Sequence, residues 1–558
     1  MRPVRSHPGD GAAVEAFLRF EQGIEVRFDD TQWQVPAVPM HARDAGPPPV
    51  SPASAPTKWI AQRLLAQGLA RSATRVPLER APGARAHALD RTVAPVVRVP
   101  LAAGEHAVLL VESERVVAWQ LPGTVEEASA GARAHSASAV REAVFVLVEP
   151  GRAAVAHATH REHALFGGWL VGALEATILK LVARRAGSSL VSALEGARRE
   201  GPVVVNDASD PGHWEEAAAF PFVAAPREGP ARILLFVHGA FSSVKAGFGT
   251  LCATQPGRDL LAGAMRQYGA VWGWDHRTLT IDPAANARRL FEALASLTLA
   301  RPPLVDIVCH SRGALVARYL IEEVLPTKTW RPLVGRVVFV GGANAGTQLA
   351  RPANWRALVD LVTNLALAGQ ATLAGLGAPQ VAAVAATLID RVAEFVGALA
   401  EGGLERSVAP GLAALDPDGA FVRDMDRAPA AGAPPAWRDC DFIESDFQPE
   451  IVDESTHRPA EFPRRLALLL ANGFVDELMH GTANDLVVDV PSMVAVRPGA
   501  CEEKDRLDFG RNPFVYHTNY LLQPQTLAAL ARWLATGAPG GANAAISARP
   551  RDPHTSAA

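Results

Sequence analysis

The stretch Val305-Asp-Ile-Val-Cys-His-Ser-Arg-Gly-Ala314 decides the fold that we expect for this chain. Its first five residues, Val305 to Cys309, are mostly apolar and predict a short buried strand. Ser311 then stands at a sharp turn, and Gly313 opens a helix that should run from Ala314 to Glu323. A turn of this kind projects the side chain at its apex into the cleft above the strand ends.

A second strand, which ends in a His-Gly turn, lies about seventy residues earlier, in Ile233-Leu-Leu-Phe-Val-His-Gly-Ala-Phe241. A serine hydroxyl that attacks an ester carbonyl creates an oxyanion, and pre-aimed N–H donors must stabilise it. We expect one donor to be the backbone N–H of Arg312 and the other to be that of Ala240 or Phe241. Each such donor lowers the barrier by roughly 3 kcal/mol. The two turns together therefore predict an acyl-transfer site.

The pattern of these turns resembles the α/β-hydrolase superfamily, in particular bacterial lipases and the lipase-like GPI inositol-deacylases. Those proteins carry His-Gly before the lid and Gly-x-Ser-x-Gly at the nucleophile turn. The resemblance covers about residues 231–536 and implies a mostly parallel sheet with a helical lid. It also implies that Ser311 is the nucleophile of a serine esterase that forms an acyl-enzyme.

One position departs from that pattern, because Cys309 replaces the first glycine of the turn. Glycine is preferred there since strand and helix pack closely, but cysteine is small enough to be tolerated. Cys309 is a weak candidate for the nucleophile, because it lies two residues back in the strand and should point away from the apex. His238 with Gly239, and His310 with Gly313, are expected to support the oxyanion loop and the turn.

The serine needs a base, and the base needs an acid that fixes its tautomer. In this fold the chain order is Ser, then Asp or Glu, then His. His517 follows a short apolar run and is the preferred base, with His480 and His457 as rivals. The preferred acid is Asp485, whose Asn-Asp-Leu-Val context resembles the segment that carries the catalytic aspartate in bacterial lipases. Asp446 stays open as the alternative acid, because it directly follows the strand from which the fold usually presents this group.

Length and composition limit the class of protein. A chain of 558 residues is too long for one ordinary core and predicts roughly two to four domains. Its hydrophobic share of 49% with 20% charged residues is that of a globular protein and not of a disordered one. The formal net charge of −4 gives no case for binding nucleic acid or an anionic membrane. The excess of arginine over lysine, with much Ala, Gly and Pro, fits a GC-rich bacterial genome.

The cysteines suggest a reduced compartment. Cys252, Cys309, Cys440 and Cys501 are widely spaced and form no Cys-x-x-Cys pair, which argues against a disulfide framework and a zinc ribbon. Residues 1–20 contain no continuous apolar stretch and no small-residue cleavage site. We therefore predict a cytoplasmic protein.

The pattern along the chain predicts several parts. Residues 1–57 should be an N-terminal segment with a flexible linker, and residues 58–225 an α+β domain that could bind a protein partner. The hydrolase domain should span residues 226–536, with the lid insertion at about 350–410, and residues 537–558 should form a disordered tail.

Predicted strands and helices follow the same division. In the N-terminal part the strands are expected at Pro95–Val99, His106–Glu112, Val116–Leu121 and Ala143–Val148, and a buried helix at Leu165–Arg185. In the hydrolase part they are expected at Ile233–Val237, Ala270–Trp274, Val305–Cys309, Arg336–Val340, Asp441–Ser445 and Phe514–Tyr516. Helices are expected at Ala284–Leu299, Ala314–Val324, Pro463–Met479 and Gln525–Leu534. The alternation of strands and helices predicts an α/β sheet covered on both faces.

The run Leu361–Ile389 contains no charged residue and is long enough for a membrane helix. Its many Ala and Gly residues, a break at Gly377–Pro379 and its amide side chains lower that signal, so we expect no transmembrane segment. A mobile lid and a fixed structural cap are equally good interpretations of this helical hairpin.

We expect neither a metal nor another cofactor. The histidines His157, His160 and His163 recur every three residues but have no accompanying carboxylate motif. The expected substrate is a small-molecule or lipid ester. Two alternatives stay open: an inactive hydrolase-fold scaffold, and an acyltransferase that uses the same three residues.

Overall fold

The structure is a computed structural model. It describes residues 2–4, 16–19, 23–28, 33–34, 55–80, 96–102, 105–113, 116–127, 141–147, 174–182, 195, 199–221, 223, 229–299, 301–427, 439–448, 479, 481–497 and 501–536. The predicted tail at 537–558, the linker before residue 55 and most of the predicted helix Pro463–Met479 lie outside these residues. So do the histidines His157, His160, His163, His457 and His480.

The C-terminal part is built on an eight-stranded sheet with the order β13-β12-β15-β14-β16-β17-β18-β19. The strands from β15 to β19 in this order are all parallel, and β12 and β13 are antiparallel at one edge. Their bounds are Gly201–Val204 (β12), Glu215–Glu216 (β13), Arg232–Val237 (β14), Ala270–Asp275 (β15), Leu304–His310 (β16), Leu333–Val340 (β17), Asp439–Phe447 (β18) and Glu502–Asn512 (β19). The predicted mostly parallel sheet is confirmed.

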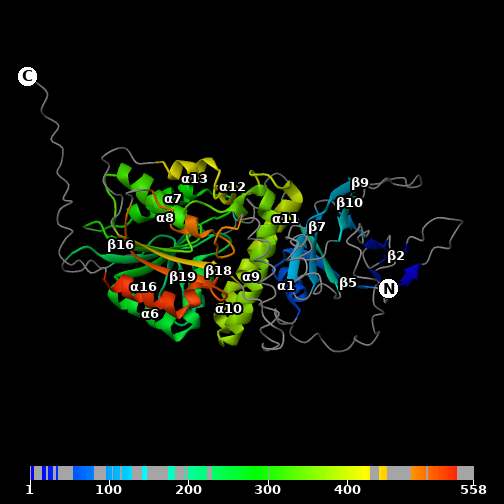
Figure 1. Ribbon diagram of the computed structural model, residues 1–558, viewed down its shortest axis with the longest axis horizontal. Helices are drawn as coiled ribbons and strands as arrows, with labels where there is room; N and C mark the ends of the chain where they lie inside the picture. The colour runs from blue at the N-terminus through cyan, green and yellow to red at the C-terminus, as the bar shows by residue number, and fades with distance from the viewer. Residues whose placement is uncertain are drawn as a thin grey trace, which may run out of the picture.

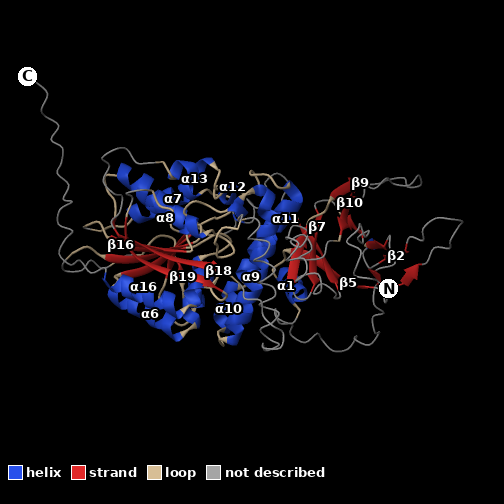
Figure 2. Ribbon diagram, in the orientation of Figure 1, coloured by secondary structure: helices blue, strands red, loops and turns tan. Residues whose placement is uncertain are grey.

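Helices cover both faces of this sheet (Figures 1 and 2). On one face lie α6 (Gln255–Gln267) and α16 (Pro524–Thr536), and on the other lie α7 (Pro283–Ala295) and α8 (Gly313–Tyr319). Alternate side chains of β14 enter different cores, because successive residues of a strand point to opposite faces. Leu234 packs with the α6 and α16 side, whereas Leu235 packs with the α7 and α8 side.

A helical insertion follows β17 and precedes β18. It consists of α9 (Trp355–Gly375), α10 (Pro379–Ala385), α11 (Thr387–Gly402), α12 (Pro410–Ala413) and α13 (Ala420–Met425). We call α9 to α12 the cap. Among the described residues, one helix, Pro352–Gly375, is long and apolar enough to cross a membrane, but 72% of its apolar window is buried inside the protein. A buried helix of the cap core explains its composition without a membrane.

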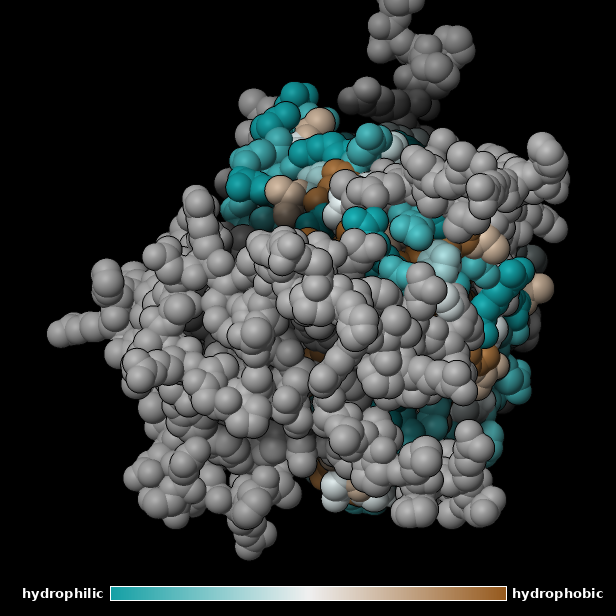
Figure 3. Space-filling view, turned by 90° about the vertical axis from the view of Figure 1, so that its right-hand side faces the viewer, coloured by the Kyte–Doolittle hydropathy of each residue, from teal (hydrophilic) through white to brown (hydrophobic). Residues whose placement is uncertain are grey.

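The N-terminal part contains two antiparallel sheets, in the orders β1-β2-β3-β6-β10-β9 and β4-β5-β11-β7-β8. Their strands are Arg2–Val4 (β1), Ala16–Arg19 (β2), Glu25–Phe28 (β3), Trp33–Gln34 (β4), Ala70–Arg80 (β5), Val96–Leu101 (β6), Glu105–Ser113 (β7), Val116–Gln120 (β8), Thr124–Glu127 (β9), Arg141–Val146 (β10) and Leu174–Val182 (β11). The sheets share one core, in which Val97 of the first lies with Val76 and Leu109 of the second. The opposite face of the second sheet packs on α1 (Pro56–Ala66) and on the cap. Figure 3 faces this end of the molecule and shows that its described surface is largely hydrophilic.

Two predicted elements are wrong. The predicted helix Leu165–Arg185 contains strand β11, which is hydrogen-bonded on both sides to β5 and β7. A short apolar run buried on both faces has the same composition as a buried helix, so its periodicity did not separate the two. The last strand of the large sheet is Glu502–Asn512 and not Phe514–Tyr516. It is an edge strand rich in charged residues, so it lacks the apolar run by which the other strands were predicted.

The cysteine pattern also requires a correction. Cys440 at the start of β18 and Cys501 just before β19 form a disulfide, with their Cα atoms 6.1 Å apart. The two residues are 61 positions apart in sequence, and the parallel pairing of β18 with β19 brings them together. Cys252 and Cys309 are free and buried.

Candidate active site

Ser311 occupies the turn between β16 and α8. Its φ is +55°, in the left-handed region, which costs a residue with a side chain about 1–3 kcal/mol. Neighbouring backbone holds this conformation: the Ser311 N–H donates to the Val340 carbonyl (3.1 Å), and the Ser311 carbonyl accepts from the Ala343 N–H (3.2 Å). The strand–turn–helix unit predicted from the sequence is therefore present, with the helix beginning at Gly313.

Cys309 lies within the strand and not at the apex. Its side chain is fully buried, and its Sγ lies 3.4 Å from the Val338 carbonyl. Burial raises the pKa of this thiol well above its usual range, so the thiolate that a nucleophile requires is disfavoured.

The His-Gly turn after β14 meets the serine turn directly. A Cβ atom placed on Gly239 would lie 2.7 Å from Ser311 Cβ and 3.2 Å from Ser311 Oγ. Only a glycine fits this close approach. The loop from His238 to Phe241 therefore lies beside the serine, as the sequence predicted.

Three backbone N–H groups were predicted as candidate oxyanion donors. The Phe241 N–H donates to Thr278 Oγ1 at 3.3 Å. Within the described residues, no hydrogen bond engages the N–H of Ala240 or that of Arg312. These two groups are thus the ones that remain open to a ligand. The Arg312 side chain is buried and donates from Nε to the Gly411 carbonyl of the cap (3.3 Å).

The His238 ring supports the turn that follows β14. Its Nδ1–H donates to the Gly239 carbonyl (2.9 Å), and its Nε2 accepts from the His276 N–H (3.2 Å). The His276 ring stacks on it with centroids 4.0 Å apart. Burial lowers the pKa of His238 to about 3, so the ring is neutral and both nitrogens are already occupied. It holds the turn and has no free nitrogen with which to act as a base.

His517 and Asp485 lie together, although 32 residues separate them. His517 Nδ1 is 2.8 Å from Asp485 Oδ2, and the His517 N–H donates to the Asp485 carbonyl (3.0 Å). The other carboxylate oxygen, Oδ1, accepts from the N–H groups of Val487 (3.1 Å) and Val488 (2.9 Å). Leu486, between Asp485 and Val487, has a left-handed φ of +82°. This turn fixes the carboxylate against the imidazole.

Asp446, the alternative acid, lies elsewhere. It is on β18, where its Oδ1 accepts from Gln448 Nε2 (3.0 Å) and its Oδ2 lies 3.7 Å from Arg511 Nε. Of the two predicted carboxylates, only Asp485 contacts His517.

The pair formed by His517 and Asp485 lies next to the serine turn. His310 donates from Nε2 to the His517 carbonyl (2.9 Å), and the two rings have centroids 4.7 Å apart. A Cβ atom on Gly341, after β17, would lie 3.1 Å from Asp485 Oδ2 and 3.4 Å from His517 Nδ1. No hydrogen bond between Ser311 Oγ and His517 occurs among the described residues; such bonds are often long in unliganded sites and shorten when a substrate binds.

Sequence reasoning missed Tyr520. Its hydroxyl donates to Asp485 Oδ2 at 3.0 Å, the same oxygen that His517 contacts. The side chain is 1% exposed, and burial raises the pKa of the phenol well above its usual range, so the hydroxyl keeps its proton. Tyr520 follows His517 by three residues in a turn, but no motif marks it.

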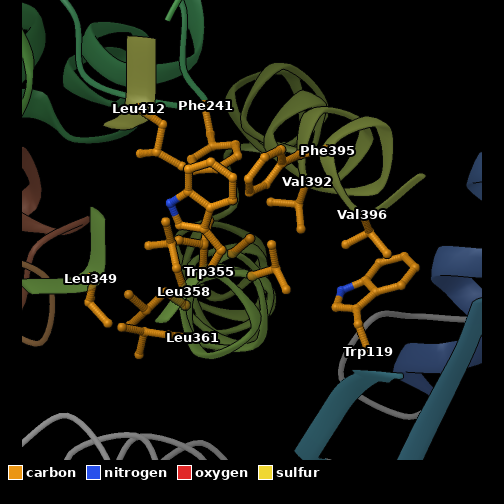
Figure 4. Packing of buried hydrophobic residues seen from close by; sticks show 14 of the residues in the cluster. Trp119, Phe241, Leu349, Trp355, Leu358, Leu361, Val392, Phe395, Val396 and Leu412 are labelled. Carbon is orange, nitrogen blue, oxygen red and sulfur yellow. The ribbon is translucent and has the colours of Figure 1, made fainter. Parts of the chain in front are cut away.

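The cap contacts the loop that follows β14 through Phe241. This residue has a left-handed φ of +54°, and its ring lies 5.5 Å from that of Phe395 on α11. Trp355 of α9 and Leu412 of α12 pack around the same rings (Figure 4). Phe241 is therefore part of the cap core.

The described residues contain no group of three or more His, Cys, Asp or Glu side chains that could hold a metal ion. The candidate site itself offers a serine hydroxyl, an imidazole, a carboxylate and two backbone N–H groups.

Strand order and the serine turn define an α/β-hydrolase fold. Residues 200–535, more than half of the chain, match the family described as a domain of unknown function (DUF7379), and the chain belongs to this family. Among curated proteins, none is similar to it in sequence at a significant level.

Solved structures similar to this chain include several hydrolases. Lipase 1 from Pelosinus fermentans is 12% identical, with 55% of this chain and 99% of that chain covered and a TM-score of 0.36. Phospholipase PlaB from Legionella pneumophila is 14% identical, with 47% of this chain and 45% of that chain covered and a TM-score of 0.25. A thermophilic esterase from Thermogutta terrifontis is 12% identical, with 61% and 98% covered and a TM-score of 0.28.

Proposed function

We propose that the chain is a serine hydrolase that cleaves carboxylic esters through an acyl-enzyme. Ser311 is the nucleophile, His517 the general base and Asp485 the acid that orients it. The observation that carries the proposal is the 2.8 Å contact between His517 Nδ1 and Asp485 Oδ2, beside a serine held at a left-handed turn.

The reaction follows from these positions. His517 Nε2 takes the proton from Ser311 Oγ as this oxygen attacks the ester carbonyl carbon. The N–H groups of Ala240 and Arg312 stabilise the oxyanion of the tetrahedral intermediate. The intermediate expels the alcohol, which receives the proton from His517 and leaves the acyl group on Ser311. A water molecule, activated by the same imidazole, then attacks the acyl-enzyme and releases the acid.

Asp485 acts through the imidazole. Its hydrogen bond keeps the proton on Nδ1, so that Nε2 is free to accept the serine proton. The carboxylate also stabilises the imidazolium that forms in each transition state.

A labelled fluorophosphonate tests the nucleophile. It should label the wild type, whereas Ser311→Ala should not react, because the attacking oxygen is gone. Ser296→Ala is a suitable control, since this serine lies at the end of α7 and its hydroxyl bonds the Ala293 carbonyl. Equal labelling of wild type and Ser311→Ala would remove the basis of the proposal.

The substrate and the final acceptor need a second experiment. A panel of p-nitrophenyl esters of increasing chain length should show turnover by wild type and none by Ser311→Ala. Adding an alcohol or amine acceptor and analysing the products separates hydrolysis from acyl transfer. Absence of both labelling and turnover would favour the inactive scaffold.

A further inference from the structure

Glu195 is a buried carboxylate that lies outside the proposed triad. It is 6% exposed and lies five residues before the region that matches the family. Three successive backbone N–H groups donate to it: Thr278 to Oε1 (2.9 Å), Leu279 to Oε1 (2.9 Å) and Thr280 to Oε2 (2.7 Å). The Thr280 hydroxyl adds a bond of 2.5 Å. A single side chain thus fixes the loop that follows β15.

One hydroxyl group connects this loop to the loop from His238 to Phe241. We call the second one the oxyanion loop, because it carries the proposed donor Ala240. Thr278 Oγ1 lies 3.5 Å from Glu195 Oε1 and accepts the Phe241 N–H at 3.3 Å. A hydroxyl has one proton, and a carboxylate oxygen can only accept. The Thr278 proton therefore points to Glu195, and an oxygen lone pair is left for Phe241.

Phe241 needs such an anchor because its backbone is left-handed (φ +54°), a conformation that is unfavourable for any residue other than glycine. Its ring is fixed in the cap core, and its N–H is fixed by Thr278. With both ends held, the peptide before Phe241 has a defined orientation. That peptide joins the Ala240 carbonyl to the Phe241 nitrogen, so it fixes one side of Ala240. The N–H on the other side of Ala240 makes no hydrogen bond within the described residues.

We propose that Glu195 and Thr278 are positioning residues that hold the oxyanion loop so that the Ala240 N–H faces the developing oxyanion. Neither residue touches the reacting atoms; Glu195 acts through Thr278, and Thr278 acts through Phe241. This inference rests on the proposed function.

Thr278→Val is the decisive variant, because it keeps the shape of the side chain and removes the hydroxyl. Its kcat on a p-nitrophenyl ester should fall roughly 10- to 100-fold, part of the loss seen when an oxyanion donor is deleted, while KM changes less than about threefold. The second-order rate of labelling by the fluorophosphonate should fall in parallel, because its phosphoryl oxygen needs the same donors. Thr278→Ser should restore both rates to within about threefold. Glu195→Gln should also lower kcat, since an amide cannot accept every bond that the carboxylate accepts.

Thr177→Val is the matched control. Thr177 is a fully buried threonine of β11, and its hydroxyl has no hydrogen-bond partner among the described residues. Both rates should stay at the wild-type level in this variant.

The outcomes separate the two proposals. If wild type is labelled and Thr278→Val is labelled equally fast, the positioning role is wrong and the proposed function stands. A loss in Thr278→Val that Thr278→Ser does not restore also overturns the positioning role. If Ser311→Ala is labelled like the wild type, both fall. Should Thr278→Val fail to fold, as judged by its melting curve, Glu195→Gln decides, and an unchanged kcat there overturns the inference.

Discussion

Phe241, Ser311 and Leu486 share an uncommon backbone conformation. They are the non-glycine residues with left-handed φ among those that the structure describes. Each lies in a different loop, and these are the loops of the proposed oxyanion donors, nucleophile and acid. Strain of about 1–3 kcal/mol at each persists only where surrounding contacts fix the backbone, which is typical of functional sites.

Also at the residue scale, mutation can distinguish Asp485 from Asp446 as the catalytic acid. Asp485→Asn should lower kcat by orders of magnitude, because the amide favours the wrong imidazole tautomer. Asp446→Asn should change kcat little, since Asp446 lies on β18 and accepts a hydrogen bond from Gln448, just after that strand. Steady-state kinetics of the two variants check this expectation, and the opposite ranking would transfer the acid role to Asp446.

Tyr520→Phe tests the residue that the sequence did not reveal. It removes the 3.0 Å hydrogen bond to Asp485 Oδ2 and leaves the ring in place. A hydrogen bond to a charged group contributes about 1.5–3 kcal/mol, so kcat should fall roughly tenfold as the carboxylate loses one of its supports. Tyr319→Phe is the control, because its hydroxyl binds Arg288 away from the site. If the two variants have the same kcat, Tyr520 does not support the acid.

At the scale of elements, helix α9 covers the edge of an N-terminal sheet with polar side chains. Asn364 exchanges two hydrogen bonds with the backbone of Val117 on β8, at 3.1 and 2.7 Å. Asp360 accepts the Trp119 N–H (2.7 Å), and Thr363 accepts from the Trp119 indole (2.8 Å). Side chains at i, i+3 and i+4 lie on one face of a helix, so α9 acts as a neighbouring strand would. Such an attachment favours a fixed cap over a freely hinged lid.

Asp360 makes this contact depend on pH. Burial raises its pKa to about 8, whereas an unfolded chain has a value near 3.8. Between these pH values the folded protein holds a proton that the unfolded chain has lost. Raising the pH through this window therefore destabilises the fold by up to about 1.4 kcal/mol per pH unit.

Thermal melts of Asp360→Asn measure this effect. The amide cannot titrate, and its oxygen can still accept the Trp119 N–H. Its melting temperature should fall less between pH 5 and pH 8 than that of wild type, and the exposed Asp259→Asn should behave like wild type. Parallel curves for wild type and Asp360→Asn would contradict the assignment.

At the scale of the whole molecule, the N-terminal sheets and the hydrolase domain are joined through the cap (Figure 1). Besides the contacts of α9, Arg63 of α1 makes a two-point salt bridge with Asp390 of α11, with both distances 2.7 Å. Within the described residues, the N-terminal part thus packs against the cap of the same chain. Binding of a separate protein there, and the domain limits at 57, 225 and 536, stay predictions.

The disulfide between Cys440 and Cys501 should stabilise the folded protein. Closing a loop of 61 residues stabilises a protein by roughly 2–4 kcal/mol, so reduction or Cys440→Ser should lower the melting temperature. Cys252→Ser is a control without that loop closure. Peptide mapping without reductant should yield linked fragments that contain Cys440 and Cys501.

Peptide mapping of protein taken directly from its source cells bears on location. A cytoplasmic location stays a prediction, and two free thiols at these positions would agree with it. A linked pair would favour an oxidising compartment.

Local chemistry explains what could be predicted from the sequence. The apolar strand, the Ser-centred turn and the following helix are consecutive in the sequence, from Leu304 to Tyr319, so each is encoded by residues close to it in the chain. The chain order Ser, acid, His made His517 the preferred candidate base and left Asp485 and Asp446 as candidate acids. The sequence did not predict the buried strand β11 or the charged strand β19, because neither shows a clear hydrophobic periodicity.

The sequence by itself predicted the fold class, the serine turn and His517 as the candidate base, since each prediction rests on short-range patterns of side chains and glycines. Only the tertiary structure showed that Asp485, and not Asp446, contacts His517, that Cys440 is joined to Cys501 and that Glu195 lies against Thr278. These pairings join residues 32 to 83 positions apart. The geometry of the folded sheet sets which of them meet, and no local propensity encodes that.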